Sequence, residues 1–266
     1  MIKINGLLVK QFNFPGGEVS VRLPKGLKAG VMYITAWLQS SDSIIALSLT
    51  CDALRRHFGK DVKLNLTVPY YPYARQDRVC SNGESLSKEV IFKLITSQCQ
   101  SNFKSFDVHS NTDKVIEVTL LDIFKQIEFK FTDDTILVAP DLGSTEKVKA
   151  LAEYYSLDWI QGIKQRDPET GKLSGFGFET DLQYDFTTKD LLIVDDICDG
   201  GGTFVGLAEV LEEHLTPKTL SLYVTHGIFS KGVTDLLRYF DTIYTTDTYL
   251  TDIEHKALVE FKVVES

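Results

Sequence analysis

The sequence predicts an α/β protein with two domains, each built on a parallel-rich sheet flanked by helices. Short, almost uninterrupted apolar segments alternate with helical segments, a pattern typical of parallel strands that are buried on both faces. The series occurs twice and the two copies meet near residues 130 to 150, in a chain of 266 residues that is long enough for two domains of modest size. We therefore expect an N-terminal domain over residues 1–132 and a C-terminal domain over residues 133–266.

In the N-terminal half, two apolar segments are each followed by a helical one. Residues 31–37 (VMYITAW) are rich in β-formers, and Ser41 or Asp42 can cap the helix that follows. Residues 62–71 (VKLNLTVPYY) predict a second strand, and a loop leads from it to a helix near residues 86–99.

The C-terminal half repeats this alternation with clearer boundaries. Its expected elements in chain order are a strand at 135–141, a helix at 146–155, a strand at 191–197, a helix at 204–214 and strands at 219–227 and 241–247. Ligands of open sheets bind beyond the carboxyl ends of the strands, so the polar residues at those ends are the candidates for function.

Composition excludes several classes of protein. A net charge of −9 argues against a nucleic-acid surface, and no apolar run approaches the roughly 18 residues that a membrane span needs. The N-terminus has neither the apolar length nor the cleavage site of a signal peptide. The four cysteines, Cys51, Cys80, Cys99 and Cys198, are scattered as in reduced proteins, so we expect a cytoplasmic location.

The segment at 191–204, LLIVDDICDGGGTF, combines an apolar strand with three acids and three glycines. Asp195 and Asp196 can accept hydrogen bonds from the two hydroxyls of a ribose or hold a hydrated Mg²⁺. The glycines at 200–202 let the backbone close around a phosphate at a helix N-terminus, and Thr203 can donate a hydroxyl or cap that helix. The alternative is an acidic surface turn with a glycine hinge. The order of residues resembles the phosphoribosyl-pyrophosphate (PRPP) motif of type I phosphoribosyltransferases.

A second candidate site lies in VPYYPYARQDR at residues 68–78, where Arg75, Gln76 and Arg78 form a compact set of donors at a strand end. Arginine suits polyphosphates because its planar fork binds oxygens bidentately and stays charged. The alternative is an exposed loop that packs against a neighbouring chain.

Together the motifs resemble one family, the ribose-phosphate diphosphokinases or PRPP synthetases. The segments that carry the resemblance, all in family order between about residues 12 and 250, are FNFPGGEVSV (12–21), CDALRRHFGK (51–60), VPYYPYARQDR (68–78), FDVHS (106–110), APDLGS (139–144), IKQRDP (163–168), LLIVDDICDGGGTF (191–204) and THGIFSKG (225–232). Ordinary phosphoribosyltransferases share only the PRPP loop, so the co-occurrence of all these segments indicates this family more specifically than any single motif does.

The resemblance implies two phosphoribosyltransferase-like domains and an Mg²⁺-dependent enzyme of nucleotide biosynthesis. The family transfers the β,γ-diphosphate of ATP to O1 of ribose 5-phosphate, giving PRPP and AMP. The residues implied for ATP are Phe14, Gly16, Gly17, Glu18, Arg75 and Gln76. Those implied for ribose 5-phosphate are Arg166, Asp195, Asp196, Asp199, Gly200, Gly201, Gly202 and Thr203. The implied catalytic residues are Lys164, Arg166 and His109, and the implied ligands of Mg²⁺ or its waters are His109 and Asp141.

The resemblance also implies a homo-oligomer, because in the family the phenylalanine loop reaches the ATP site of an adjacent subunit. Each residue has a structural alternative. His109 can be a structural hydrogen-bonder, Lys164 and Arg166 solvated charges of a mobile loop, and Asp141 the cap of the next helix. Phe14 can pack into the core, as aromatic residues near an N-terminus usually do.

Two other functions compete with synthesis of PRPP. A phosphoribosyltransferase that consumes PRPP accounts for the glycine loop but leaves YARQDR, FDVHS and the Lys-x-Arg segment without a role. A silent regulatory subunit would have lost Lys164, Arg166 or His109, and all three are present.

The sequence departs from the family pattern in several places. Gly16 replaces the acid of the phenylalanine loop, which loosens adenine recognition, and Gly200 replaces the first threonine of Thr-Gly-Gly-Thr, which removes one hydroxyl donor. The segment before the Phe14 loop is about half the family's usual length and the C-terminus stops early, so we expect a shortened member, as from a virus or another reduced genome.

Regulation by ADP is predicted to be weak or absent. In the family, basic residues after RQDR help to form a regulatory site for phosphate and ADP. Residues 79–88 of this chain contain a single basic residue, Lys88. Titration of ADP at saturating ATP should show simple competition and no more. Sigmoidal inhibition would contradict this prediction.

Overall fold

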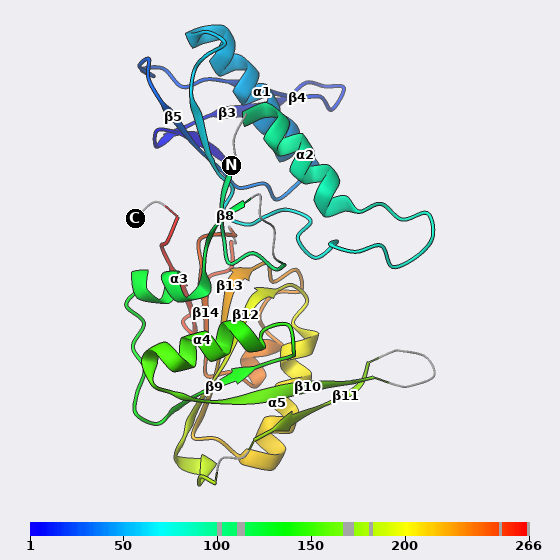
Figure 1. The fold of residues 1–266 in the computed structure, drawn as a ribbon, viewed down its shortest axis with the longest axis vertical. Coiled ribbons are helices and arrows are strands. Elements are labelled where there is room, and N and C mark those ends of the chain that lie inside the picture. Colours follow the sequence, from blue (N-terminus) through cyan, green and yellow to red (C-terminus); the bar gives the residue numbers. More distant parts are fainter. Residues whose placement is uncertain (100–102, 111–114, 167–172, 181–182, 250–251, 265–266) are drawn as a thin grey trace. The chain divides into compact units, whose positions relative to one another are not determined.

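The computed structural model describes residues 1–99, 103–110, 115–166, 173–180, 183–249 and 252–264, and it divides the chain into two compact units, Met1–Thr119 and Leu120–Ser266 (Figure 1). The domain boundary expected after residue 132 stays a prediction, since compactness alone defines these two units. Cys51, Cys80 and Cys198 are free thiols. None of the helices in the described ranges combines the length and the hydropathy needed to cross a membrane.

The first unit contains a six-stranded sheet and a separate hairpin. The sheet order is β2 (Leu7–Leu8), β1 (Ile2–Ile4), β5 (Met32–Ala36), β6 (Leu64–Thr67), β7 (Phe103–Phe106) and β8 (Val115–Val118). The four strands from β5 to β8 are parallel, and β1 pairs antiparallel with both of its neighbours. The hairpin consists of β3 (Lys10–Asn13) and β4 (Val19–Arg22), and the helices are α1 (Ser41–Phe58) and α2 (Ser87–Cys99).

Two boundaries in this unit differ from the expectation. Ser40, not Ser41 or Asp42, caps α1: its hydroxyl accepts the backbone N–H of Ser43, whose side chain accepts the N–H of Ser40 in return. Strand β6 ends at Thr67 instead of continuing to residue 71, because the prolines in VPYYP lack the amide hydrogen that a continued ladder needs.

The second unit contains a seven-stranded sheet in which, among the described residues, β10 pairs antiparallel with β11 and the other pairings are parallel. The order is β11 (Leu173–Glu179), β10 (Asp158–Arg166), β9 (Thr135–Ala139), β12 (Asp190–Cys198), β13 (Thr219–Gly227), β14 (Thr242–Thr246) and β15 (Leu258–Phe261). Its helices are α3 (Leu120–Gln126), α4 (Thr145–Tyr155) and α5 (Gly202–Leu215), with short 3₁₀ turns at Phe186–Thr188 and Leu236–Arg238.

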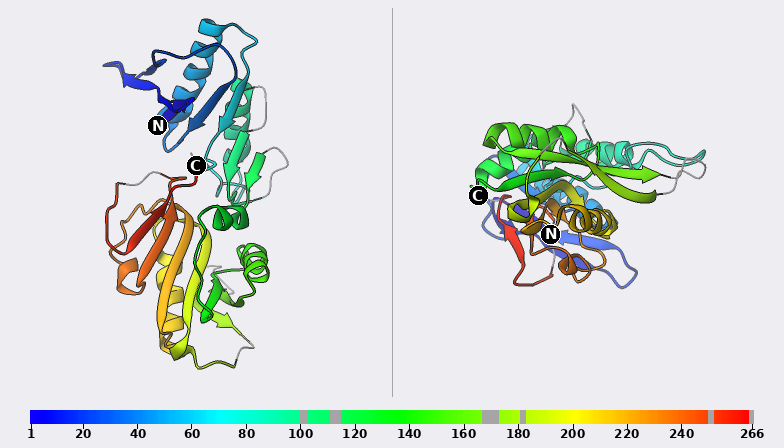
Figure 2. Two further views of the ribbon diagram at one scale, coloured as in Figure 1. Left: turned by 90° about the vertical axis from the view of Figure 1, so that its left-hand side faces the viewer. Right: turned by 90° about the horizontal axis from the view of Figure 1, so that it is seen from below.

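Helices cover both faces of this sheet, and Figure 2 shows α4 on one side and α5 on the other. Successive side chains of the central strand β12 point to opposite faces of the sheet. Leu191 and Ile193 belong to the core that includes the apolar face of α5. On the opposite face the ring of Phe124 in α3 lies 4.4 Å from that of Tyr223 in β13. The α/β prediction with parallel-rich sheets flanked by helices is therefore confirmed.

One glycine sets how closely β10 approaches the neighbouring strand end. A Cβ on Gly162 would lie 2.8 Å from the carbonyl oxygen of Ala139 and 2.9 Å from that of Pro140, and neither backbone atom can move aside cheaply. Gly162→Ala should therefore lower the free energy of unfolding by about 1–3 kcal/mol, the usual cost of overpacking.

Urea unfolding of the two proteins measures this change. Gly16→Ala is the matched control, since a Cβ at Gly16 meets nothing within 4 Å. Equal midpoints for wild type and Gly162→Ala would show that the strands can separate at no cost.

Candidate functional site

The acidic segment of the second unit lies inside a strand. Strand β12 continues past Asp195 and Asp196 and ends at Cys198, two residues after Asp196. Both acids therefore belong to the strand, and Asp195 lies opposite Val224 of β13 in the parallel ladder. Asp195 is half-buried, and only 6% of Asp196 is exposed. Asp195 is thus the more accessible of the two acids.

Three carboxylates crowd the carboxyl ends of β9 and β12. Burial, and then the negative charges of Asp196 and Asp141, raise the pKa of Asp195 well above its ordinary value. The backbone N–H of Asp196 donates to Oδ1 of Asp195 at 2.9 Å, which offsets part of this effect. The arrangement favours a partner that supplies hydrogen-bond donors or positive charge.

Asp141 also has a local structural role. Its Oδ1 accepts the backbone N–H groups of Gly143 at 2.9 Å and Ser144 at 3.2 Å, and the Ser144 hydroxyl donates to its carbonyl oxygen at 2.9 Å. These bonds order the turn that leads into α4, but the N-cap residue of that helix is Ser144 and no side chain caps it, so the helix-capping alternative for Asp141 is wrong. The same carboxylate still acts electrostatically on Asp195.

The glycine loop leads directly into α5. Gly201 is the N-cap residue, with φ +77°, and a Cβ there would lie 3.2 Å from the side chain of Leu236, so glycine is required for two reasons. No side chain caps the helix, which shows that Thr203 does not act as the cap. A Cβ at Gly202 would meet nothing within 4 Å. Gly202, the first residue of α5, is therefore exposed.

The Lys-x-Arg segment lies in a strand and not, as expected, in a loop. Lys164 and Arg166 belong to β10, where Lys164 pairs with Phe176 and Arg166 with Leu173 of β11. Residues 167–172 lie outside the described part of the chain, and so do the side chains of Lys164 and Arg166. Their catalytic roles stay predictions.

In the first unit, the phenylalanine loop is the tip of the β3–β4 hairpin. The N–H of Phe14 donates to the carbonyl of Glu18, and the N–H of Gly17 donates back to the carbonyl of Phe14, both at 2.8 Å. The Phe14 ring is 52% exposed and makes an edge contact with Phe12. The alternative in which Phe14 packs into the core is therefore wrong, and the loop presents its ring, Glu18 and Gly16 to solvent.

Arg75, Gln76 and His109 also lie at the surface of the first unit, on two loops that one buried lysine joins. The backbone N–H of Lys88 donates to the Gln76 carbonyl at 3.2 Å. Its ammonium donates to the Ser110 carbonyl at 2.9 Å and to the Ser110 hydroxyl at 2.6 Å. Sequence reasoning missed this role of Lys88, because nothing in SKEVIFKL distinguishes a buried lysine from a solvated one.

Only 6% of Lys88 is exposed, and burial lowers the pKa of its ammonium group. The His109 loop is thereby held to the loop of Arg75 and Gln76. Each unit thus gathers its own set of expected site residues. The proposed His109–Asp141 metal pair takes one residue from each unit and stays a prediction.

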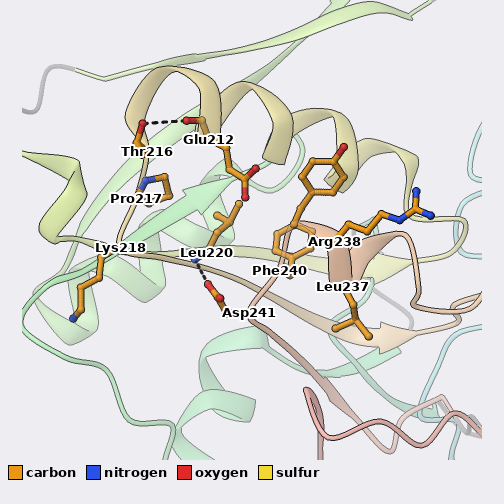
Figure 3. Close-up of a pocket in the computed structure, with 10 residues that line it drawn as sticks. Glu212, Thr216, Pro217, Lys218, Leu220, Leu237, Arg238, Phe240 and Asp241 are labelled. Atoms are coloured by element: carbon orange, nitrogen blue, oxygen red, sulfur yellow. Dashed lines mark hydrogen bonds between the residues drawn. The ribbon is translucent and has the colours of Figure 1, made fainter.

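A surface cavity of about 430 Å³ lies away from these residues, at the amino-terminal end of β13 (Figure 3). It is lined by Glu212, Thr216, Pro217, Lys218, Leu220, Leu237, Arg238, Tyr239, Phe240 and Asp241. The Asp241 carboxylate accepts the backbone N–H of Leu220 at 2.9 Å, so this acid stabilises the start of the strand. The strand ends that carry Asp195 lie at the opposite edge of the sheet.

Comparisons with known proteins agree with these motifs. Residues 2–98 match the family model of the N-terminal domain of ribose phosphate pyrophosphokinase. The chain is 33% identical to a ribose-phosphate pyrophosphokinase of Pyrococcus furiosus, with 92% of this chain and 88% of that protein covered. It is 31% identical to one of Thermococcus kodakarensis, with 92% and 87% covered.

The fold matches the crystal structure of phosphoribosylpyrophosphate synthetase from Mycobacterium smegmatis with a TM-score of 0.79 at 21% identity, covering 96% of this chain and 86% of that one. Shared motifs, identity along most of the chain and a common two-domain fold lead to one conclusion: the chain belongs to the ribose-phosphate pyrophosphokinase family of enzymes.

Proposed function

We propose that this chain transfers the β,γ-diphosphate of ATP to O1 of ribose 5-phosphate, giving PRPP and AMP, with Mg²⁺ as the cofactor. The observation that carries the proposal is the junction of β12 and α5, where Asp195 is followed by a glycine loop and by the N-terminus of a helix that no side chain caps. A sugar phosphate needs both parts, since its hydroxyls donate to carboxylates and its phosphate accepts from backbone N–H groups.

In this proposal, ribose 5-phosphate lies across the carboxyl end of β12. Asp195 accepts from the ribose hydroxyls, and Asp196, which is more buried, supports it from within the strand. The segment from Asp199 to Thr203 surrounds the 5-phosphate, where α5 is long enough, at 14 residues, for its dipole to favour an anion. The raised pKa of Asp195 supports this role, because a hydroxyl donor compensates for the lost hydration of its carboxylate.

ATP is assigned to the surface loops of the first unit. Arg75 and Gln76 are exposed and offer donors for phosphate and ribose oxygens. The exposed Phe14 ring offers a flat face for adenine, with Glu18 near the polar edge of the base. We propose that this hairpin serves the ATP site of a neighbouring subunit, as an exposed apolar ring at a hairpin tip suits an intersubunit contact.

The residues present fit a magnesium ion. The described residues hold no group of three or more His, Cys, Asp or Glu side chains that could form a metal site. Mg²⁺ commonly uses one or two carboxylates together with substrate phosphates and water, so such a group is not required. His109 and Asp141 would hold the ion or its waters. When bound, it would supply neutralisation of the negative charge on the transferred group.

Lys164 and Arg166 would act on the reacting phosphates. Attack on the β-phosphorus needs the ribose O1 and the leaving AMP oxygen in line, and charge on the diphosphate must be stabilised while it moves. Two cations at the end of β10, the strand beside β9 and Asp141, would provide that stabilisation without forming a covalent bond.

We also place the enzyme in the cytoplasm, which its free thiols at Cys51, Cys80 and Cys198 support.

Regulation by ADP has little support in the geometry. The single basic residue of the segment at 79–88 is Lys88, and its ammonium is buried against Ser110. It does not present a surface charge to a nucleotide at an allosteric site.

A single assay distinguishes the candidate reactions. Incubation of the enzyme with ATP, Mg²⁺ and ribose 5-phosphate should form AMP and PRPP in equal amounts. Formation of ADP would identify an ordinary kinase. Formation of neither nucleotide would favour the silent subunit or the PRPP-consuming transferase over the proposed reaction.

Asp195→Asn should weaken ribose 5-phosphate binding and stabilise the protein. Loss of the charged acceptor should raise the Michaelis constant for ribose 5-phosphate roughly tenfold or more, with a smaller effect on that for ATP. Because the pKa of Asp195 is raised in the folded state, its charge costs stability as the pH rises through that value. The variant should therefore unfold at a higher temperature than wild type near pH 8, with the difference shrinking in acid.

Asp133→Asn is the matched control, since Asp133 is an exposed acid outside the site. Steady-state kinetics and thermal unfolding at several pH values measure both effects. An effect confined to ATP would refute the sugar assignment, and a lower melting temperature would show that the charge conflict is already relieved.

A further inference from the structure

Lys231, to which neither the motifs nor the proposed function assigns a role, lies beside the phosphate loop. A Cβ on Gly200 would lie 3.5 Å from Cε, 3.6 Å from Cδ and 3.9 Å from Nζ of Lys231. The lysine comes from the turn after β13, and Gly200 from the loop after β12. Two segments distant in sequence thus bring an ammonium group to the loop that precedes α5.

The backbone that carries Lys231 is fixed to the loop by hydrogen bonds. The N–H groups of Ile228 and Phe229 donate to the Cys198 carbonyl at 2.9 and 3.0 Å, and the N–H of Ser230 donates to the Asp199 carbonyl at 3.1 Å. The Phe229 side chain, two residues before Lys231, is only 3% exposed. The base of the lysine side chain is therefore anchored, and its exposed ammonium can adjust over the loop.

The loop itself needs a cation. Residues 195–203 contain three aspartates and no basic residue. A phosphate dianion placed there meets the N–H groups of α5 but also the negative charge of Asp199, at the start of the glycine run. Within the described part of the chain, Lys231 has no hydrogen bond or ion pair of its own, so its ammonium is available to a ligand.

We propose that Lys231 binds the 5-phosphate of ribose 5-phosphate. The inference rests on the proposed function, because it takes the site of that substrate as given. The family motif has threonine where this chain has Gly200, and the Cβ of a threonine would be in contact with Lys231. This chain thus replaces a hydroxyl donor from the loop by an ammonium donor from the following turn.

The role is specific to the phosphate end of the substrate. A lysine at this loop adds a charged hydrogen bond to a dianion, which is stronger than the hydroxyl bond it replaces. The affinity for ribose 5-phosphate should therefore depend on ionic strength through this contact. Binding of ATP in the first unit should be independent of it.

Equilibrium binding tests this role without catalysis. Ribose 5-phosphate is titrated into the full-length protein in the calorimeter, with Mg²⁺ and without ATP. Lys231→Met removes the charge and keeps most of the aliphatic stem, and it should weaken binding roughly tenfold. Lys231→Arg should retain affinity close to that of wild type, because the guanidinium also donates to phosphate.

Two further variants control for charge and for the donor at position 200. Lys149→Met removes an exposed lysine in the middle of α4 and should leave the affinity unchanged. Gly200→Thr in the Lys231→Met background should recover part of the lost affinity, because the threonine hydroxyl restores a side-chain donor to the loop. Melting temperatures within a few degrees of wild type confirm that each variant is folded.

The outcomes separate this inference from the proposed function. Unchanged affinity in Lys231→Met, or an equal loss in Lys149→Met, would overturn the role of Lys231 while AMP formation by the wild-type enzyme still supported the reaction. Absence of ribose 5-phosphate binding by the wild-type protein would overturn both. A loss confined to Lys231→Met and reversed by arginine would establish the contact.

Discussion

The second unit depends on a charge conflict that its fold maintains. Parallel pairing along β12 holds the strand that carries Asp195 and Asp196, and the turn after β9 holds Asp141 near them. The negative charges of Asp196 and Asp141 raise the free-energy cost of ionising Asp195. Hydrogen bonds of the strand and of the turn hold these residues in place. Such a site lowers the stability of the folded protein when no ligand is bound. A ligand that supplies hydrogen-bond donors or positive charge recovers part of that free energy when it binds.

Two features near these carboxylates supply positive charge. The helix N-terminus behind the glycine loop contributes partial positive charge, and the close approach of β10 at Gly162 brings the strand of Lys164 beside β9. The first unit is organised on a different principle, with exposed donors on two loops and one buried ammonium, that of Lys88, holding the loops together.

Much of this could be predicted from sequence, for identifiable reasons. Strand β13 was expected at its observed bounds, since TLSLYVTHG is rich in β-branched and large apolar residues and ends at a glycine. Strands β10 and β11 were missed because they are rich in polar residues and glycine, and β2 has only two residues. The exposure of Phe14, the burial of Lys88 and the position of Lys231 depend on contacts between distant segments, which local pattern does not encode.

The closeness of Gly200 and Lys231 bears on how such a loop can change over generations. A Cβ at position 200 would meet the lysine side chain at 3.5 to 3.9 Å, which is ordinary van der Waals contact, and α5 and β13 separate the two positions along the chain. A hydroxyl side chain at one position and a long cation at the other are therefore compatible, so a lineage can gain the ammonium donor before it loses the hydroxyl. The phosphate loop then keeps at least one side-chain donor throughout the exchange.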